Sequence, residues 1–182
     1  MTTVDPIRNK EDIRKMKDVL LKKCYRDYLI FEVGINTGLR ISDILNLKVS
    51  DVRDKYYIEI RERKTKKPKK FRINEFLRKE LEEYIASKQD EDYIFDSLRT
   101  PGKNLDRVRI YRILNTAAWN AGLKIRIGTH TMRKTFGFHF YQKTKDIALL
   151  QQIFNHSSPS MTLRYIGINQ DILDNAMTDF VL

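Results

Sequence analysis

One stretch in the C-terminal part of the chain gathers side chains that bind anions and move protons. It contains His130, Arg133, His156 and Tyr165, and Asp146 is the only carboxylate between the first and the last of them. Arginine, histidine and tyrosine can hold a phosphate or a similar anion, whereas hard divalent cations need carboxylate and other oxygen ligands. The stretch therefore predicts a site for an anion and no metal site.

Two of these side chains are predicted to share the first turn of one helix. Thr129 is a suitable N-cap, and apolar residues at helical spacing predict a helix over 130–141. His130 and Arg133 are three residues apart, so they lie on one face of that helix. Free backbone N–H groups and the helix dipole favour negative charge at this end.

The other two are predicted around a turn between two further helices. The first of these helices is expected to end at Asn155, because asparagine tolerates the left-handed conformation of a helix end. Ser158 followed by Pro159 predicts an N-cap with proline at the first helical position. His156 is then expected in the turn, and Tyr165 about two helical turns later.

The pattern formed by these residues resembles the C-terminal signature of tyrosine recombinases, the phage integrase family. Its parts are His130-x-x-Arg133, His156-Ser157-Ser158 and, nine residues after that histidine, Tyr165. Upstream, the segment that resembles the family's box for its first catalytic arginine is Thr37-Gly38-Leu39-Arg40-Ile41-Ser42-Asp43-Ile44-Leu45. A lone H-x-x-R motif occurs by chance, but these elements follow one another in the right order between about residues 5 and 168.

The resemblance implies roles for the tyrosine and for two arginines. Tyr165 is expected to be the nucleophile that forms a 3′-phosphotyrosyl link with DNA, and Arg40 and Arg133 are expected to stabilise the phosphorane. Each planar guanidinium stays charged and can grip two oxygens, which suits a pentacovalent centre with extra negative charge. Asp43 stands where the family more often has glutamate, and it is expected to be structural.

The resemblance also implies how protons are moved. The tyrosine hydroxyl has an unperturbed pKa of roughly 10, so it needs a base near neutral pH, and His130 is the expected base. Lys64 best matches the lysine that protonates the leaving 5′ oxygen, with Lys66 and Lys67 as close alternatives. His156 is expected to hydrogen-bond the phosphate or to orient the tyrosine. No cofactor is expected, because the phosphotyrosyl bond keeps the energy of the cut bond.

The composition favours a polyanionic partner. The chain has 182 residues, of which 41% are hydrophobic, so one domain or two small ones with a real core are expected. It carries 35 lysines and arginines against 24 acids, a net charge of +11, which points to nucleic acid. The single cysteine, Cys24, excludes a disulfide framework. No signal peptide or membrane-spanning run is present, which predicts a cytoplasmic protein, and the resemblance implies that it is encoded by a bacterium or a phage.

The positive charge is concentrated in two parts of the chain. Residues 55–72 contain nine Lys or Arg and two acids, and residues 99–126 contain seven and one. The predicted DNA contacts in these parts are Lys66, Lys67, Lys69, Arg107, Arg109 and Arg112. A solvated basic face is the alternative for the helix that carries the arginines. The expected partners are double-stranded DNA and further copies of the chain, up to a tetramer on DNA, and no membrane.

Hydrophobic periodicity predicts a mainly α fold with a small antiparallel β-sheet (α+β) in one globular unit. The resemblance implies that this unit, residues 1–182, is a single tyrosine-recombinase catalytic domain. Helices are expected from Asn9 onward and over 25–36, 41–47, 74–88, 105–121, 146–154 and 170–178, strands over 56–62, 69–73 and 93–95, and a loop over 99–103. Gly38 and Gly122 are expected to end helices, and His139 is expected in the core. The tail over 167–182 is expected to pack on its own core or on a neighbouring subunit.

Other readings remain open at this point. Many family members carry an additional N-terminal DNA-binding domain that is absent here, so a fragment and a minimal member are both possible, and DNA affinity is expected to be modest and salt-dependent. A catalytically silent DNA-binding relative keeps the fold, and a type IB topoisomerase shares the chemistry but only relaxes supercoils. A metal-dependent nuclease needs a carboxylate cluster, which the stretch lacks.

Overall fold

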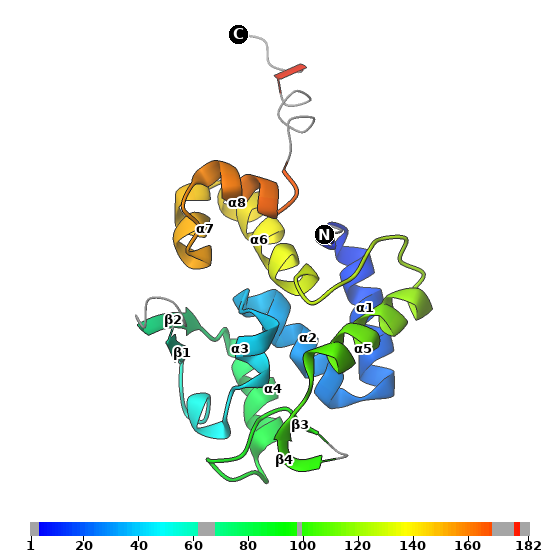
Figure 1. Cartoon of the computed structure of the whole chain (residues 1–182), viewed down its shortest axis with the longest axis vertical. Coiled ribbons are helices and arrows are strands. Elements are labelled where there is room, and N and C mark those ends of the chain that lie inside the picture. Colours follow the sequence, from blue (N-terminus) through cyan, green and yellow to red (C-terminus); the bar gives the residue numbers. More distant parts are fainter. Residues whose placement is uncertain (1–3, 62–67, 98–99, 169–176, 179–182) are drawn as a thin grey trace.

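The computed structural model describes residues 4–61, 68–97, 100–168 and 177–178, and these form a mainly helical protein (Figure 1). Its helices are α1 (Lys10–Lys23), α2 (Tyr25–Thr37), α3 (Ile41–Leu45), the 3₁₀ turn η1 (Val49–Asp51), α4 (Glu75–Ile85), α5 (Arg107–Asn120), α6 (Thr131–Thr144), α7 (Ile147–Phe154) and α8 (Pro159–Tyr165). Its strands are β1 (Tyr57–Arg61), β2 (Pro68–Arg72), β3 (Asp96–Ser97) and β4 (Thr100–Asn104). The predicted fold class is confirmed, with the described strands arranged as two separate antiparallel pairs.

Helix α2 occupies the centre of the molecule. It packs against α1, α3, α4 and α6 (Figure 1). Its side chains Leu29, Phe31 and Val33 are at most 1% exposed, which makes it part of the main hydrophobic core. Because α2 touches both α3 and α6, it fixes the distance between the two parts of the chain that carry the predicted arginines.

A smaller core lies between α6, α7 and α8. Its buried residues are Leu150, Phe154, Ile166 and Ile168. Gly137 of α6 allows the three helices to approach closely, because a Cβ at this position would lie 2.7 Å from the side chains of Phe154 and Ile166. Tyr165 packs against this smaller core, so its position depends on the packing of α6, α7 and α8.

Local sequence signals set most helix ends around the site. The side chains of Asn74, Asp146 and Ser158 each accept a hydrogen bond from a backbone N–H in the first turn of the helix that follows. Gly38 ends α2 with φ 69°, and Asn155 ends α7 with φ 54°, both left-handed as predicted. These ends place the turns that carry the predicted site residues.

The predicted N-cap at Thr129 is wrong. Helix α6 begins at Thr131, and His130 occupies the N-cap position without a side-chain capping bond. The Thr131 hydroxyl accepts a hydrogen bond from the Gly128 N–H at 3.0 Å, and the Thr131 N–H donates to the Gly128 carbonyl at 3.0 Å. These two bonds form a turn that leads directly into α6. At its other end α6 continues to Thr144, beyond the end predicted at residue 141.

The third strand predicted over 93–95 is also wrong. Tyr93 makes an isolated antiparallel bridge to Lys48, and the strand of this region is β3, immediately downstream. Its partner β4 covers most of the predicted loop. A two-residue strand is too short to show an alternating pattern, so its pairing could not be read from the sequence.

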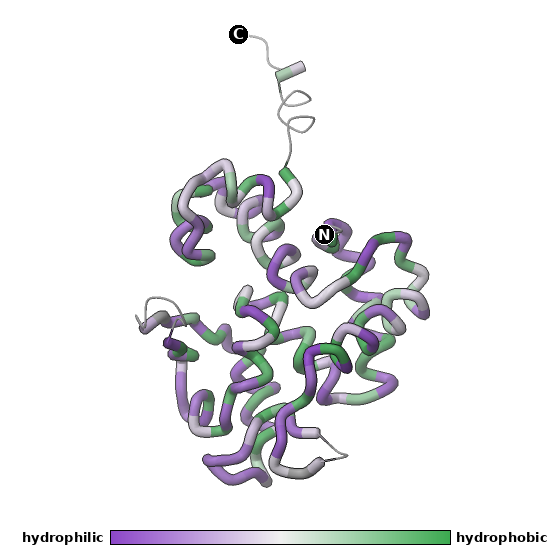
Figure 2. Tube along the Cα trace, in the orientation of Figure 1, coloured by the Kyte–Doolittle hydropathy of each residue, from purple (hydrophilic) through white to green (hydrophobic). Residues whose placement is uncertain are grey.

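The far C-terminal helix predicted over 170–178 lies outside the described residues, except for Met177 and Thr178, and its packing stays a prediction. Among the residues that the structure describes, no helix combines the length and the apolar character that crossing a membrane requires. Figure 2 agrees, since hydrophilic positions interrupt each of these helices.

Replacing Gly38 by alanine is expected to destabilise the protein by about 2–4 kcal/mol, because two costs add. The backbone has φ 69°, and a Cβ would collide with the ring of Phe136. Gly122→Ala is the matched control: its φ is 72°, and nothing lies within 4 Å of the added Cβ. Urea unfolding should therefore show a smaller loss for the control, about 1 kcal/mol. Equal losses for both variants contradict the role of Phe136.

Candidate active site

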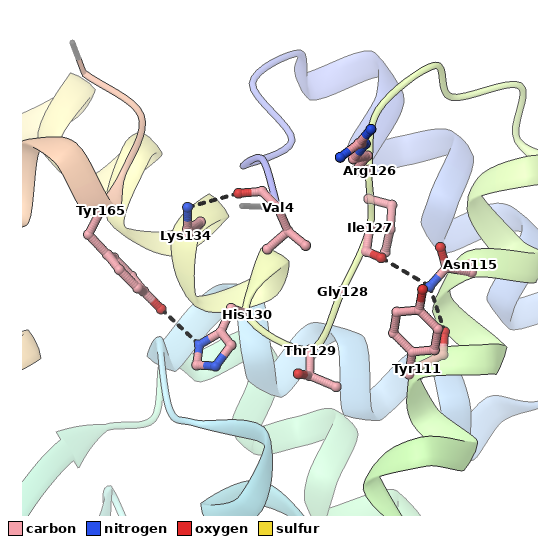
Figure 3. A pocket seen from close by; sticks show the side chains of 10 residues that line it. All are labelled: Val4, Tyr111, Asn115, Arg126, Ile127, Gly128, Thr129, His130, Lys134 and Tyr165. Carbon is pink, nitrogen blue, oxygen red and sulfur yellow. Dashed lines mark hydrogen bonds between the residues drawn. The ribbon is translucent and has the colours of Figure 1, made fainter. Parts of the chain in front are cut away.

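Tyr165 ends α8 with its hydroxyl next to the imidazole of His130. Figure 3 shows the two side chains pointing toward one another, and Tyr165 Oη lies 3.2 Å from His130 Nδ1. Both border a cleft of about 790 Å³ that is also lined by Lys134 and by the loop Arg126–Thr129. The N-cap position of His130 in α6 and the end of α8 thus bring together residues 35 positions apart.

Arg133 lies beside this pair and is only 4% exposed. Its guanidinium donates to the Gly38 carbonyl and, at 3.0 Å, to the Phe154 carbonyl, and it lies close enough to the Tyr165 hydroxyl to lower the pKa of that group. The Phe154 ring lies under it, 4.2 Å from ring centroid to Cζ. One side chain therefore ties the end of α2 to the end of α7, next to Tyr165.

Arg40 is exposed at the N-cap of α3, two residues after the carbonyl that anchors Arg133. Burial, partly opposed by Tyr165 and assisted by the positive charge of Arg40, lowers the pKa of Arg133 to about 10. The two guanidinium groups are therefore close enough to repel one another, on the same side of the molecule. An anion between them would relieve this repulsion.

His156 lies in the turn between α7 and α8, as predicted. Its Nδ1 is 3.1 Å from the hydroxyl of Thr162, and its carbonyl accepts a hydrogen bond from the Gln151 amide at 3.1 Å. Its ring centroid lies 5.1 Å from that of Tyr165. Phe154 contacts both rings edge-on, at 5.4 and 5.5 Å, so one buried phenylalanine supports the histidine and the tyrosine together.

The charges around the tyrosine define its protonation. Burial raises the pKa of the Tyr165 hydroxyl, and the charges of Arg133 and Arg40 partly oppose this increase. Partial burial lowers the pKa of His130, and neighbouring cations, first Arg133 and then Lys134, lower it further. At neutral pH the phenol is therefore protonated and the imidazole is neutral, so the hydroxyl can donate to His130 Nδ1. The site is ready to transfer a proton and carries uncompensated positive charge.

The hairpin β1–β2 is present, with Tyr57 opposite Arg72 and Arg61 opposite Pro68. Lys69 lies in β2 opposite Ile60. The three lysines considered for the general acid lie outside the described residues; they are Lys64, Lys66 and Lys67. Their assignment stays a prediction.

The arginines of α5 are all exposed. Arg107, in the first turn, is close enough to the site for its charge to lower the pKa of His130. Arg109 and Arg112 lie further along the same helix and are exposed as well. Only Arg107 is thus connected to the site by an interaction among the described residues.

Sequence reasoning missed two residues of the site. For Phe154, the available signal was its position directly before the turn that carries His156. Lys134 was not considered, and no pattern in the sequence marks it. His139 is half-buried with Nε2 2.9 Å from the Ile7 carbonyl, which agrees with the predicted structural role. Within the described ranges, no three His, Cys, Asp or Glu side chains cluster as metal ligands.

On a mainly helical fold, two arginines and two histidines from separate parts of the chain thus surround one tyrosine, an arrangement of the class that binds an anion next to a hydroxyl nucleophile. The sequence matches the phage integrase family over residues 9–171, and the chain belongs to this family.

Known relatives agree with this membership. The probable integrase/recombinase YoeC of Bacillus subtilis (strain 168) is 54% identical over 171 residues, which cover 94% of this chain and 93% of YoeC. The crystal structure of XerA recombinase superposes with a TM-score of 0.77 at 26% identity, over 97% of this chain and 65% of XerA. The crystal structure of XerH site-specific recombinase bound to difH substrate, a pre-cleavage complex, superposes with a TM-score of 0.74 at 22% identity, over 98% of this chain and 55% of XerH. At this low identity the similarity supports only the fold. The chain thus spans less than two thirds of these two recombinases.

Proposed function

We propose that this protein is a site-specific DNA recombinase that cuts and rejoins strands through a 3′-phosphotyrosyl intermediate on Tyr165. The observation that carries the proposal is the convergence of Arg40, Arg133, His130 and His156 around one tyrosine from separate parts of the chain. Because the site is cationic and contains no carboxylate ligand set among these residues, a phosphodiester is the substrate that fits it best.

In the first step, Tyr165 Oη attacks the scissile phosphorus while its proton passes to His130 Nδ1. Arg133 and Arg40 bind the nonbridging oxygens as the phosphorane gains charge, and His156 hydrogen-bonds the phosphate or holds the tyrosine. The bond from phosphorus to the 5′ oxygen breaks, and that oxygen takes a proton from the hairpin lysine, assigned to Lys64. In the second step a 5′ hydroxyl of another strand attacks the phosphotyrosine and releases Tyr165.

Exposed basic residues of α5 extend the same surface. Arg107, Arg109 and Arg112 are free to reach a duplex laid across the cleft, and together with Lys66, Lys67 and Lys69 they form the proposed DNA contacts. Exchange of strands between two sites requires several active sites, so the proposed assembly is a homo-oligomer of up to four copies on DNA. We further propose that the protein acts in the bacterial cytoplasm and is encoded by a bacterium or a phage.

Trapping on a nicked suicide substrate tests the proposal. The expected result is a covalent adduct in which the protein is linked to a 3′ phosphate of the DNA. The adduct should form equally well in the presence of EDTA, and digestion with proteinase should free the DNA from the protein. Relaxation of a supercoiled plasmid without exchange between paired sites would instead identify a topoisomerase-like activity. Adduct formation that disappears in EDTA contradicts the mechanism.

The rate of adduct formation is expected to fall at acidic pH. The pKa of His130 is lowered, so the imidazole is neutral and able to accept a proton above that pKa, and it loses this ability as the pH drops through it. His130→Gln should lower the rate at neutral pH by about 10²–10⁴-fold and remove the acidic limb. Initial rates between pH 5 and 8 at constant ionic strength measure this. If the fall in rate at acidic pH persists in His130→Gln but is absent in His156→Gln, the base is His156 and not His130.

A further inference from the structure

Lys134 directly follows Arg133 in α6 and is buried, with 6% of its surface exposed. Its ammonium donates a hydrogen bond to the Val4 carbonyl at 2.8 Å and lies 5.3 Å from the ring centroid of Tyr165 (Figure 3). Burial lowers the pKa of Lys134, and the charge of Asp5 opposes this decrease. Placing an ammonium here costs free energy, because water is largely replaced by one carbonyl and one aromatic face.

The Val4 carbonyl is itself held in place, because the N-terminal segment (residues 4–8) is tied to α6 and to the loop before it. The Ile7 N–H donates to the Thr135 hydroxyl at 2.9 Å, and the Ile7 carbonyl lies 2.9 Å from His139 Nε2. The Asp5 N–H donates to the Arg126 carbonyl at 3.3 Å. The ammonium is therefore fixed by a part of the chain that is rigidly attached.

The same N-terminal segment reaches both sides of the site. Val4 packs against Gly128, two residues before His130, so closely that a Cβ on this glycine would lie 2.8 Å from Val4 Cγ1. At the other end, the Arg8 guanidinium donates to the Gly167 carbonyl at 2.8 Å, two residues after Tyr165. The segment thus bridges the chain that precedes the predicted base and the chain that follows the predicted nucleophile.

We propose that Lys134 is a positioning residue for Tyr165: anchored on the N-terminal segment, its ammonium holds the phenol ring in the orientation for attack. A cation is attracted to the face of an aromatic ring, and the attraction grows when water is excluded. It also grows as the phenol loses its proton, since the ring then gains negative charge, so the contact is stronger in the transition state than in the resting site. This inference rests on the proposed function of Tyr165.

The first test compares cleavage by Lys134→Met with cleavage by the parent chain on the suicide substrate. The side chain keeps its length and loses its charge. The expected rate of adduct formation is about tenfold to thirtyfold lower, the size of a cation–π contact in a desolvated site, with DNA affinity within about twofold of the parent. Lys145→Met is the matched control, because Lys145, at the opposite end of the same helix, is exposed and lies over the ring of Tyr141, 5.7 Å from its centroid. Its rate should equal that of the parent.

A second measurement separates positioning of the tyrosine from action on the phosphate. In a Tyr165→Phe background, hydrogen peroxide supplies a small external nucleophile that attacks the same phosphorus and expels the 5′ oxygen. Because the peroxide needs no ring to be oriented, Lys134→Met should leave this cleavage unchanged. A loss of the same size in both reactions overturns the inference, since Lys134 would then act on the phosphate or on the fold.

Thermal unfolding accompanies each variant. If Lys134→Met does not fold, Lys134→Gln replaces it in both rate comparisons. The glutamine has no charge but keeps a donor toward the Val4 carbonyl. Cleavage at the parental rate by a folded Lys134 variant also overturns the inference. The proposed function is judged separately, from adduct formation by the parent chain and its dependence on Tyr165, whereas the role of Lys134 is judged from the ratio of rates between its variant and the parent.

Discussion

Tyr165→Phe is expected to abolish the covalent protein–DNA adduct and to leave DNA binding nearly intact. The substitution removes the only atom proposed to attack phosphorus, so adduct formation should fall by more than about 10⁴-fold, to the background of the assay. The phenyl ring keeps its contacts with Phe154 and His156, and only the hydrogen bonds of the hydroxyl are lost, so affinity should change by no more than about 1 kcal/mol. Denaturing gels measure the adduct, and gel shifts at fixed salt measure binding.

Tyr141→Phe is the matched control for this result. Tyr141 also packs on the smaller core but belongs to α6, and its ring faces Lys145, away from the cleft. Because Tyr141→Phe removes a hydroxyl that is not proposed to react, adduct formation should stay at the parental level. An adduct that persists in Tyr165→Phe shows that another residue is the nucleophile and ends the proposed mechanism.

The helix ends around the site could be predicted because they depend on a few neighbouring residues. Asn155 takes the left-handed conformation at the end of α7, and Ser158 caps α8, so the turn that carries His156 follows from the sequence alone. The same applies to Gly38, which ends α2 and places Arg40 at the start of α3.

The failed predictions concern features decided by pairings that no local sequence pattern marks. Thr129 has the right chemistry for a cap, but the side chain of Thr131 bonds Gly128 instead and is 1% exposed, so the turn closes differently. β3 exists only because β4 pairs with it, and its two residues carry no period of their own.

Lys134 shows the same limit within the site. Lysine is almost always solvated, and a reading of the sequence has to assume so. The burial of Lys134 depends on the carbonyl of Val4, 130 residues away in the sequence. Likewise, H-x-x-R indicates that Arg133 binds an anion but not that the guanidinium also spans Gly38 and Phe154.

This double attachment makes Arg133→Lys the most informative conservative substitution. A lysine keeps the charge but presents one compact ammonium, so it cannot bond the Gly38 and Phe154 carbonyls and still reach Tyr165 and a phosphate oxygen. Adduct formation is expected to fall by about 10³-fold, the range for losing a preorganised donor to the transition state. A melting curve should show a smaller but real loss of stability, because buried carbonyls lose their donors.

Arg14→Lys provides the reference for the same chemical change at a surface position. Arg14 pairs with Glu11 across one turn of α1, at 2.6 Å and in contact with solvent, and such exposed pairs contribute little to stability. This control should cleave and melt like the parent. If Arg133→Lys also cleaves at the parental rate, then positive charge alone suffices at this position. The attachment of one guanidinium to the ends of α2 and α7 is then not what prepares Tyr165 for attack.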